Sequence, residues 1–97
     1  MKQQDATPSW SSLEQVYLIE RDAGLLCRIL GLYAARGIDV LRADYAYAAQ
    51  DVMTLKVRVA AELADTAETV RVLVAKAASF VGVLAAAEQP AGVQRAA

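Results

Sequence analysis

The turn Arg21-Asp22-Ala23-Gly24 is the part of the sequence best suited to bind a small ligand. It joins a strand-like segment to a helical one, so the free N–H groups of the first helical turn can hold a carboxylate, aided by the helix dipole. Gly24 would let a ligand approach the backbone closely. The same residues also fit a simpler role, in which Gly24 makes a tight turn and Asp22 caps the helix.

Composition limits the other chemistry that this chain can perform. It contains no His and a single Cys, Cys27, which excludes an intrachain disulfide and a multi-Cys metal cluster. With no His to activate its thiol, Cys27 is expected to be a structural residue, packed or partly exposed. Acid–base catalysis near neutral pH would need a carboxylate, Lys, Tyr or Cys with a shifted pKa. We therefore expect no catalytic residue, no metal site and no cofactor.

Charge and hydropathy narrow the range of partners. The net charge is −1 with both signs interspersed, so no basic stripe is present to bind nucleic acid. The longest apolar stretch, 80–87, is far shorter than the roughly 20 residues of a membrane-spanning helix. The polar N-terminus lacks the pattern of a secretion signal, which favours a soluble, cytoplasmic protein. Asp39 and Asp44 could each recognise an ammonium group, or could pair with Arg42.

The chain is long enough for one domain, which we place at residues 13–88. The segments 1–12 and 89–97 are predicted to be mobile tails, because they contain Pro or Gly and lack a periodic apolar pattern. Trp10 is the exception, since a large aromatic residue in a tail either docks on its own domain or on a neighbour, or stays free.

Two periodicities alternate within the domain. Apolar and β-branched residues predict strands over 13–20, 38–49, 53–59 and 80–87. The second strand is expected to be either apolar on both faces near its start or bulged there. A helix is predicted from Leu25 to the pair Arg36-Gly37, where Gly suits a left-handed residue after the last turn. Its expected buried face consists of Leu26, Ile29, Leu30 and Tyr33.

The second helix is predicted to follow a capping box formed by Asp65 and Glu68. Its expected buried face consists of Val70, Leu73, Val74 and Ala77. We expect the four tyrosines to pack in the core and at an interface: Tyr17, Tyr33, Tyr45 and Tyr47.

The order β-α-β-β-α-β predicts an α+β, ferredoxin-like fold, a four-stranded antiparallel sheet with two helices on one face. The strand at 38–49 would lie at an edge of that sheet, with no Pro or Lys to discourage pairing. We therefore expect a twofold homodimer through this edge. The interface residues would be Leu41, Ala43, Tyr45 and Tyr47.

The run from Ile19 to Val40, most specifically its part from Gly24 to Val40, resembles the ACT domain and, more narrowly, the small regulatory subunit of acetolactate synthase (acetohydroxyacid synthase) in branched-chain amino acid biosynthesis. The shared features are Gly24-Leu25-Leu26, Arg28, Gly31-Leu32-Tyr33 and the motif Arg36-Gly37-x-(Asn/Asp)-(Val/Ile). The second half of the chain matches in pattern only.

This resemblance implies the fold described above, with two domains sharing one eight-stranded sheet. It also implies an amino-acid pocket at the dimer interface, between the 21–26 turn of one chain and the start of the second strand of the other. In the family, the carboxylate of valine meets the helix N-terminus. The ligand-binding residues would then be Arg21, Asp22, Ala23, Gly24, Leu25, Leu26 and Asp39.

Two positions depart from the family pattern, because Arg21 and Asp39 stand where Asn is usual. Arg21 could bind a carboxylate, pair with Asp39 of the second chain or point outward. Full-length members also carry a second domain, and the short form resembles subunits of isozymes with weak or no valine feedback. We therefore expect an activating partner of the acetolactate synthase catalytic subunit with little valine response. The alternatives are a stand-alone ACT module that binds an amino acid for another enzyme and, far less favoured, a small dimeric isomerase.

Overall fold

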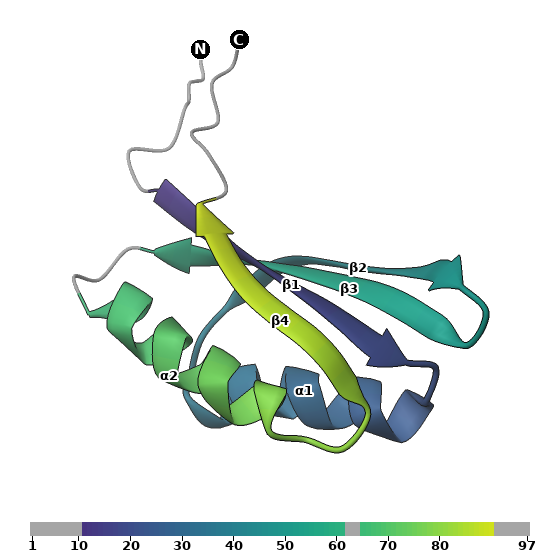
Figure 1. Ribbon diagram of the computed structural model, residues 1–97. Coiled ribbons are helices and arrows are strands. Elements are labelled where there is room, and N and C mark those ends of the chain that lie inside the picture. The colour runs from purple at the N-terminus through teal and green to yellow at the C-terminus, as the bar shows by residue number, and fades with distance from the viewer. Residues whose placement is uncertain (1–10, 62–64, 91–97) are drawn as a thin grey trace, which may run out of the picture.

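The computed structural model describes residues 11–61 and 65–90, which form six elements in the order β-α-β-β-α-β (Figure 1). The elements are β1 (Ser11–Glu20), α1 (Ala23–Ala35), β2 (Val40–Ala49), β3 (Val52–Ala61), α2 (Thr66–Ala78) and β4 (Val83–Pro90). Trp10 and most of both predicted tails lie outside the described residues. β1 begins at Ser11 rather than Leu13, because its pairing with β3 continues to Ser11 opposite Ala61.

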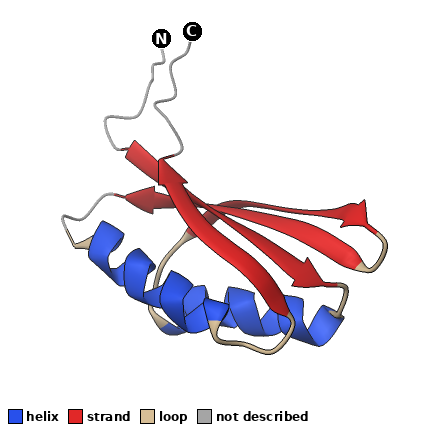
Figure 2. Cartoon of the chain, in the orientation of Figure 1, coloured by secondary structure: helices blue, strands red, loops and turns tan. Residues whose placement is uncertain are grey.

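The four strands form one antiparallel sheet in the order β2-β3-β1-β4, and both helices cover the same face (Figure 2). This arrangement confirms the predicted α+β, ferredoxin-like fold and the edge position of β2. The predicted irregularity in β2 is present as a register shift between Val40 and Arg42. The other face of the sheet has no helix over it in the described part of the chain.

Helix α1 ends as its sequence predicts. Gly37 adopts φ +67°, its N–H donates to the Ala34 carbonyl, and the Ile38 N–H donates to the Tyr33 carbonyl. This pair of hydrogen bonds is a Schellman motif. The guanidinium of Arg36 also donates to the Leu32 carbonyl at 3.2 Å, which satisfies one more carbonyl of the last turn.

The buried face of α1 is rotated slightly from the predicted one. Ile29 and Tyr33 are buried as expected, whereas Leu26 and Leu30 are only partly buried at the margin of the core. Leu25 and Leu32 take the central positions instead. The buried face is set by packing against the rest of the core, which the local pattern does not contain.

Helix α2 buries Val70, Leu73 and Ala77 as predicted, with Val74 partly buried. The predicted capping box is wrong. Asp65 occupies the N-cap position, but its side chain makes no capping hydrogen bond, because its backbone (φ −94°, ψ 5°) is not extended. Glu68 instead forms an ion pair with Arg71 on the same helix.

The fourth strand was predicted to start at Phe80, but β4 starts at Val83. Residues 79–82 form a turn, in which Gly82 has φ +100° and its carbonyl accepts from the Glu20 N–H at 2.9 Å. Phe80 lies in this turn and not in a strand. Its side chain packs against the core, and the guanidinium carbon of Arg28 lies 5.6 Å from the centroid of its ring.

Candidate functional site

The β1–α1 turn begins with a capped helix. Asp22 has an extended backbone (φ −157°, ψ 113°), and its Oδ1 accepts hydrogen bonds from the N–H groups of Gly24 at 2.9 Å and Leu25 at 3.4 Å. The capping alternative is therefore confirmed. The first helical amides already face a carboxylate, which belongs to the chain itself. A ligand carboxylate at this place would have to displace it.

The side chains of the predicted ligand turn divide into two groups. Arg21, Asp22, Ala23 and Gly24 are exposed. A Cβ added at Gly24 would lie 3.3 Å from Asp22 Oδ1, the one neighbouring atom within 4 Å among the described residues. The side chain of Leu25 is buried, and that of Leu26 is partly buried. The turn therefore presents polar groups and backbone to solvent, while its leucines anchor it to the core.

Arg21 has a partner that the sequence did not indicate. Its guanidinium lies 3.3 Å from Asp51 Oδ1, and its N–H donates to the Asp51 carbonyl at 2.8 Å. Asp51 belongs to the β2–β3 hairpin, which the β1–β3 register brings beside the end of β1, with Glu20 opposite Val52. A hollow of about 540 Å³ lies here, lined by Glu20, Arg21, Gln50, Asp51, Val52 and Leu84.

Asp39 lies at the opposite end of α1 from the Arg21-Gly24 turn. It follows the C-terminal end of α1 and lines a separate hollow of about 290 Å³ with Arg36, Ile38 and Thr66. The 13 residues of α1 separate it from Asp22, which corresponds to roughly 20 Å at 1.5 Å per residue. One protomer therefore does not bring Arg21 and Asp39 together.

Strand β2 is exposed along its whole length. Ala43, Tyr45 and Tyr47 are paired with Val57, Leu55 and Met53, which are buried under the helices, so these β2 side chains share that face of the sheet. They remain accessible because the helices do not extend over the edge: Tyr45 is 37% and Tyr47 63% exposed. Leu41, 47% exposed, occupies the bulge. The role of these four residues in a dimer remains a prediction.

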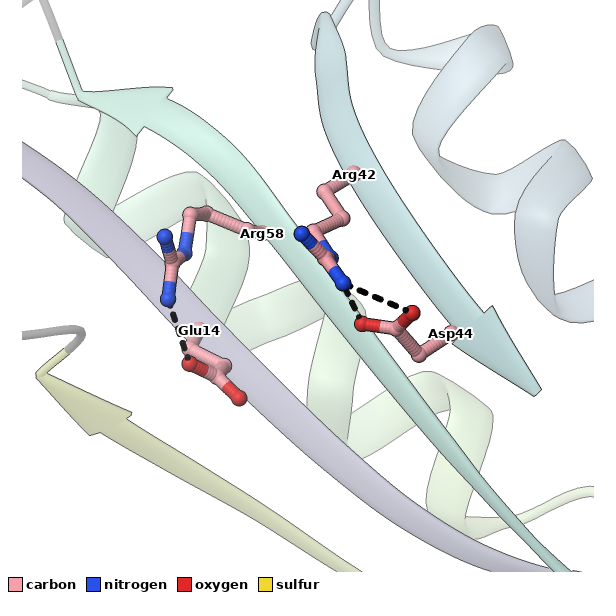
Figure 3. Close-up of polar contacts among 4 residues, drawn as sticks. All are labelled: Glu14, Arg42, Asp44 and Arg58. Carbon is pink, nitrogen blue, oxygen red and sulfur yellow. Dashed lines mark hydrogen bonds and ion pairs between the residues drawn. The ribbon is translucent and has the colours of Figure 1, made fainter. Parts of the chain in front are cut away.

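Asp44 pairs with Arg42 on the same strand, one of the two alternatives considered from the sequence. The Arg42 guanidinium donates from Nε to Asp44 Oδ2 at 2.8 Å and from Nη2 to Oδ1 at 3.3 Å (Figure 3). This two-point contact lowers the pKa of Asp44 and raises that of Arg42. Asp44 is therefore engaged within its own chain, on the face of the sheet away from the helices.

A buried polar network was missed. Tyr17 and Tyr33 are in the core as predicted, and their hydroxyl oxygens are 2.7 Å apart. Tyr33 also donates to Oε1 of Gln15, which is fully buried. The signal was available in the alternation of β1, because Gln15 shares the phase of Tyr17 and Ile19. Burial raises the pKa of both tyrosines.

The described residues include no cluster of three or more His, Cys, Asp or Glu residues that could hold a metal ion. Cys27 is exposed on α1. Neither helix in the described ranges is long and apolar enough to cross a membrane.

Comparison with known proteins identifies the architecture. No family model and no curated protein matches the sequence. Solved structures do match: the ACT domain of GTP pyrophosphokinase from Chlorobium tepidum has a TM-score of 0.66 at 12% identity, over 84% of this chain and 100% of that one. This chain has the ACT-domain fold.

Two further structures share the fold. The C-terminal domain of the MgtC protein from Mycobacterium tuberculosis has a TM-score of 0.72 at 15% identity, over 87% of this chain and 90% of that one. The regulatory subunit of aspartate kinase from Thermus thermophilus has a TM-score of 0.66 at 15% identity, over 82% of this chain and 51% of that one. This ACT-fold chain thus spans about half of the aspartate kinase subunit. At these identities the likeness establishes the fold alone.

Proposed function

We propose that this ACT-fold chain is a non-catalytic regulatory subunit, which pairs through β2 and activates the catalytic subunit of acetolactate synthase with little response to valine. The observation that carries the proposal is the run Ile19 to Val40, which resembles the acetolactate synthase small subunit and here forms α1 and both of its flanking turns. The fold and the exposed edge strand are what such a subunit requires.

A twofold pair would assemble the site that one chain lacks. If β2 of one copy lies antiparallel to β2 of the second, the start of one strand lies opposite the end of the other. Asp39, just before the start, would then approach the Gln50-Asp51 turn of the second copy, where Arg21 is held. Arg21, Asp51 and the second copy's Asp39 would share one hollow. An ammonium group could meet two carboxylates there.

The weak valine response follows from the capped turn. A valine carboxylate would compete with the Asp22 side chain for the amides of Gly24 and Leu25. Asp22 is tethered, so it has a high effective concentration at those amides and pays no cost of association. Two carboxylates at the same helix N-terminus would also repel each other. Activation of the catalytic subunit, in contrast, needs only a docked dimer.

The decisive experiment mixes the purified chain with the acetolactate synthase catalytic subunit of the same organism and measures turnover with and without valine. We expect turnover to rise by about 5- to 150-fold, as is usual for a coupling between sites, and valine to change it little. Unchanged turnover would refute the acetolactate synthase assignment. Strong inhibition by valine would refute the capped-turn argument but not the assignment.

The second candidate is a stand-alone ACT module that binds an amino acid for a different enzyme. It is favoured by the matched structures, which include an ACT domain of GTP pyrophosphokinase and a subunit of aspartate kinase. This candidate predicts heat on titration with one amino acid and no effect on acetolactate synthase. Gly24→Asp, which adds a second carboxylate beside Asp22, should abolish that heat if the turn is the site.

A further inference from the structure

The face of the sheet away from the helices carries a cluster of five charged side chains. Its members are Glu14 on β1, Arg42 and Asp44 on β2, and Lys56 and Arg58 on β3. The register places them in two rows across the strands, with Arg42 opposite Arg58 and Arg58 opposite Glu14 in one, and Asp44 opposite Lys56 in the next. Figure 3 shows four of them on three neighbouring strands.

Two internal ion pairs fix the arginines. Arg42 contacts both oxygens of Asp44, and Arg58 Nη2 lies 3.3 Å from Glu14 Oε1 (Figure 3). Directly opposed like charges on adjacent strands repel each other, and the two carboxylates offset this repulsion between Arg42 and Arg58. The pairs therefore hold both guanidinium groups in defined positions, with Arg58 only 37% exposed.

The cluster nevertheless carries an excess of positive charge, because three cations face two carboxylates. Lys56 has no carboxylate within 4.0 Å among the described residues, although Asp44 is its cross-strand neighbour. Arg58 Nε is shielded from solvent and donates to no acceptor in the same part of the chain. The hydrogen bond from Arg42, together with the charges of Arg42, Lys56 and Arg58, lowers the pKa of Asp44, and all three cations line one hollow.

A hollow of about 330 Å³ lies between these five side chains and no others. We propose that it binds a small oxyanion, a carboxylate or a phosphate group, which Lys56 and the guanidinium groups of Arg42 and Arg58 would hold together. The planar guanidinium of arginine can donate two hydrogen bonds to two oxygens of a carboxylate or a phosphate, and lysine adds an adaptable point charge. An anion here would neutralise the excess charge and relieve the repulsion between the two arginines.

This site does not depend on the proposed regulatory function. It lies on the open face of the sheet, whereas the Gly24 turn belongs to α1 on the other face. With Glu14 and Asp44 present and most of the cluster exposed, we expect a weak site, with a dissociation constant in the millimolar range and a strong dependence on salt.

The test is an NMR titration of the full chain with inorganic phosphate and, in a second series, with acetate, both at constant ionic strength adjusted with chloride. We expect saturable shifts at the amides of Arg42, Lys56 and Arg58. If the shifts saturate with phosphate alone, the site binds phosphate groups. If they also saturate with acetate, it binds carboxylates as well. The highest anion concentration, about 50 mM, is well above the millimolar dissociation constant expected for an exposed charge cluster. The absence of saturable shifts with either anion up to that concentration would refute the site.

Two variants move the affinity in opposite directions. Lys56→Gln removes the unpaired cation and should weaken phosphate binding about tenfold, whereas Glu14→Gln removes a carboxylate of similar shape and should strengthen it by a similar factor. Lys76→Gln is the matched control, because Lys76 is exposed on α2, away from the open face. Equal effects of Lys56→Gln and Lys76→Gln would reveal general charge screening and overturn the proposal.

Discussion

The hydroxyl of Tyr33 donates a 2.8 Å hydrogen bond to Oε1 of Gln15, and both side chains are buried. Because the single proton of Tyr33 is used here, its oxygen accepts from the hydroxyl of Tyr17, 2.7 Å away. The three groups form one chain that joins α1 to β1 through the core. Nε2 of Gln15 has no hydrogen-bond partner within the described ranges, so the side chain of Gln15 is only half satisfied in the core.

Tyr33→Phe should destabilise the protein by about 1–3 kcal/mol, because it leaves both Tyr17 and Gln15 buried without their common partner. The measurement is urea unfolding followed by circular dichroism. Val72→Ala is the control, since Val72 is 54% exposed on α2, away from β2, and should change stability by less than about 0.5 kcal/mol. Equal effects of the two variants would contradict a structural role for the network.

Alkaline pH should unfold the protein cooperatively. Burial raises the pKa of Tyr17 and Tyr33 above the ordinary value of about 10. Below pH 10 both tyrosines are neutral in both states and their contribution to stability is complete. Above about pH 10 the unfolded chain releases these protons and the folded chain does not, so stability falls as pH rises. Urea unfolding at several pH values should show this decline, and Tyr33→Phe should make it less steep.

The local patterns predicted the elements well because the two periodicities are set by neighbouring residues. The alternation of Met53, Leu55 and Val57 and the Arg36-Gly37 helix end correspond directly to the structure. The errors arise where tertiary contacts decide. Phe80 was assigned to the fourth strand on its apolar side chain, which instead packs under Arg28 before β4 begins. Leu32 is buried because packing against the sheet and α2 sets the rotation of α1.

The candidate site was less predictable for the same reason. Asp22 could be assigned as a cap because its partners are two and three residues away. The pairing of Arg21 with Asp51 spans the sheet register, and nothing close to Arg21 in the sequence indicates it. The proposed approach of Asp39 to this turn requires a second copy of the chain, so it rests on the family resemblance and is not contained in one protomer.

The two helix starts differ in a way that mutation can measure. Asp22→Ala should cost about 0.5–2 kcal/mol, because its carboxylate accepts from two N–H groups of α1. Asp65→Ala should cost much less, since its side chain makes no such bond at the start of α2. Thermal or urea unfolding of both variants compares them directly. If Asp65→Ala proved the more damaging, the assignment of the caps would be wrong.

Two glycines should respond to alanine with opposite signs. At Gly31, on the exposed side of α1, an added Cβ meets no atom within 4 Å, so Gly31→Ala should stabilise by about 0.4–1 kcal/mol. At Gly82 the backbone has φ +100° and the Cβ would lie 2.8 Å from Leu25 Cδ2. Gly82→Ala should therefore destabilise, by more than Gly31→Ala stabilises. The melting temperatures of the two variants provide the measurement.

The exposed tyrosine of the edge strand allows a test of the dimer that leaves the core intact. Tyr47→Lys places a charge within the proposed twofold contact, near the end of β2, and a lysine at a sheet edge discourages pairing. We expect this variant to sediment as a monomer at micromolar concentration while the parent chain is a dimer. Val72→Lys, on the exposed side of α2 with Val72 54% exposed, is the matched control and should remain dimeric. Because activation is proposed to need a docked dimer, the monomeric variant should also lose any effect on the catalytic subunit. Full activation by a monomer would separate activation from the edge strand and place the docking surface within one protomer.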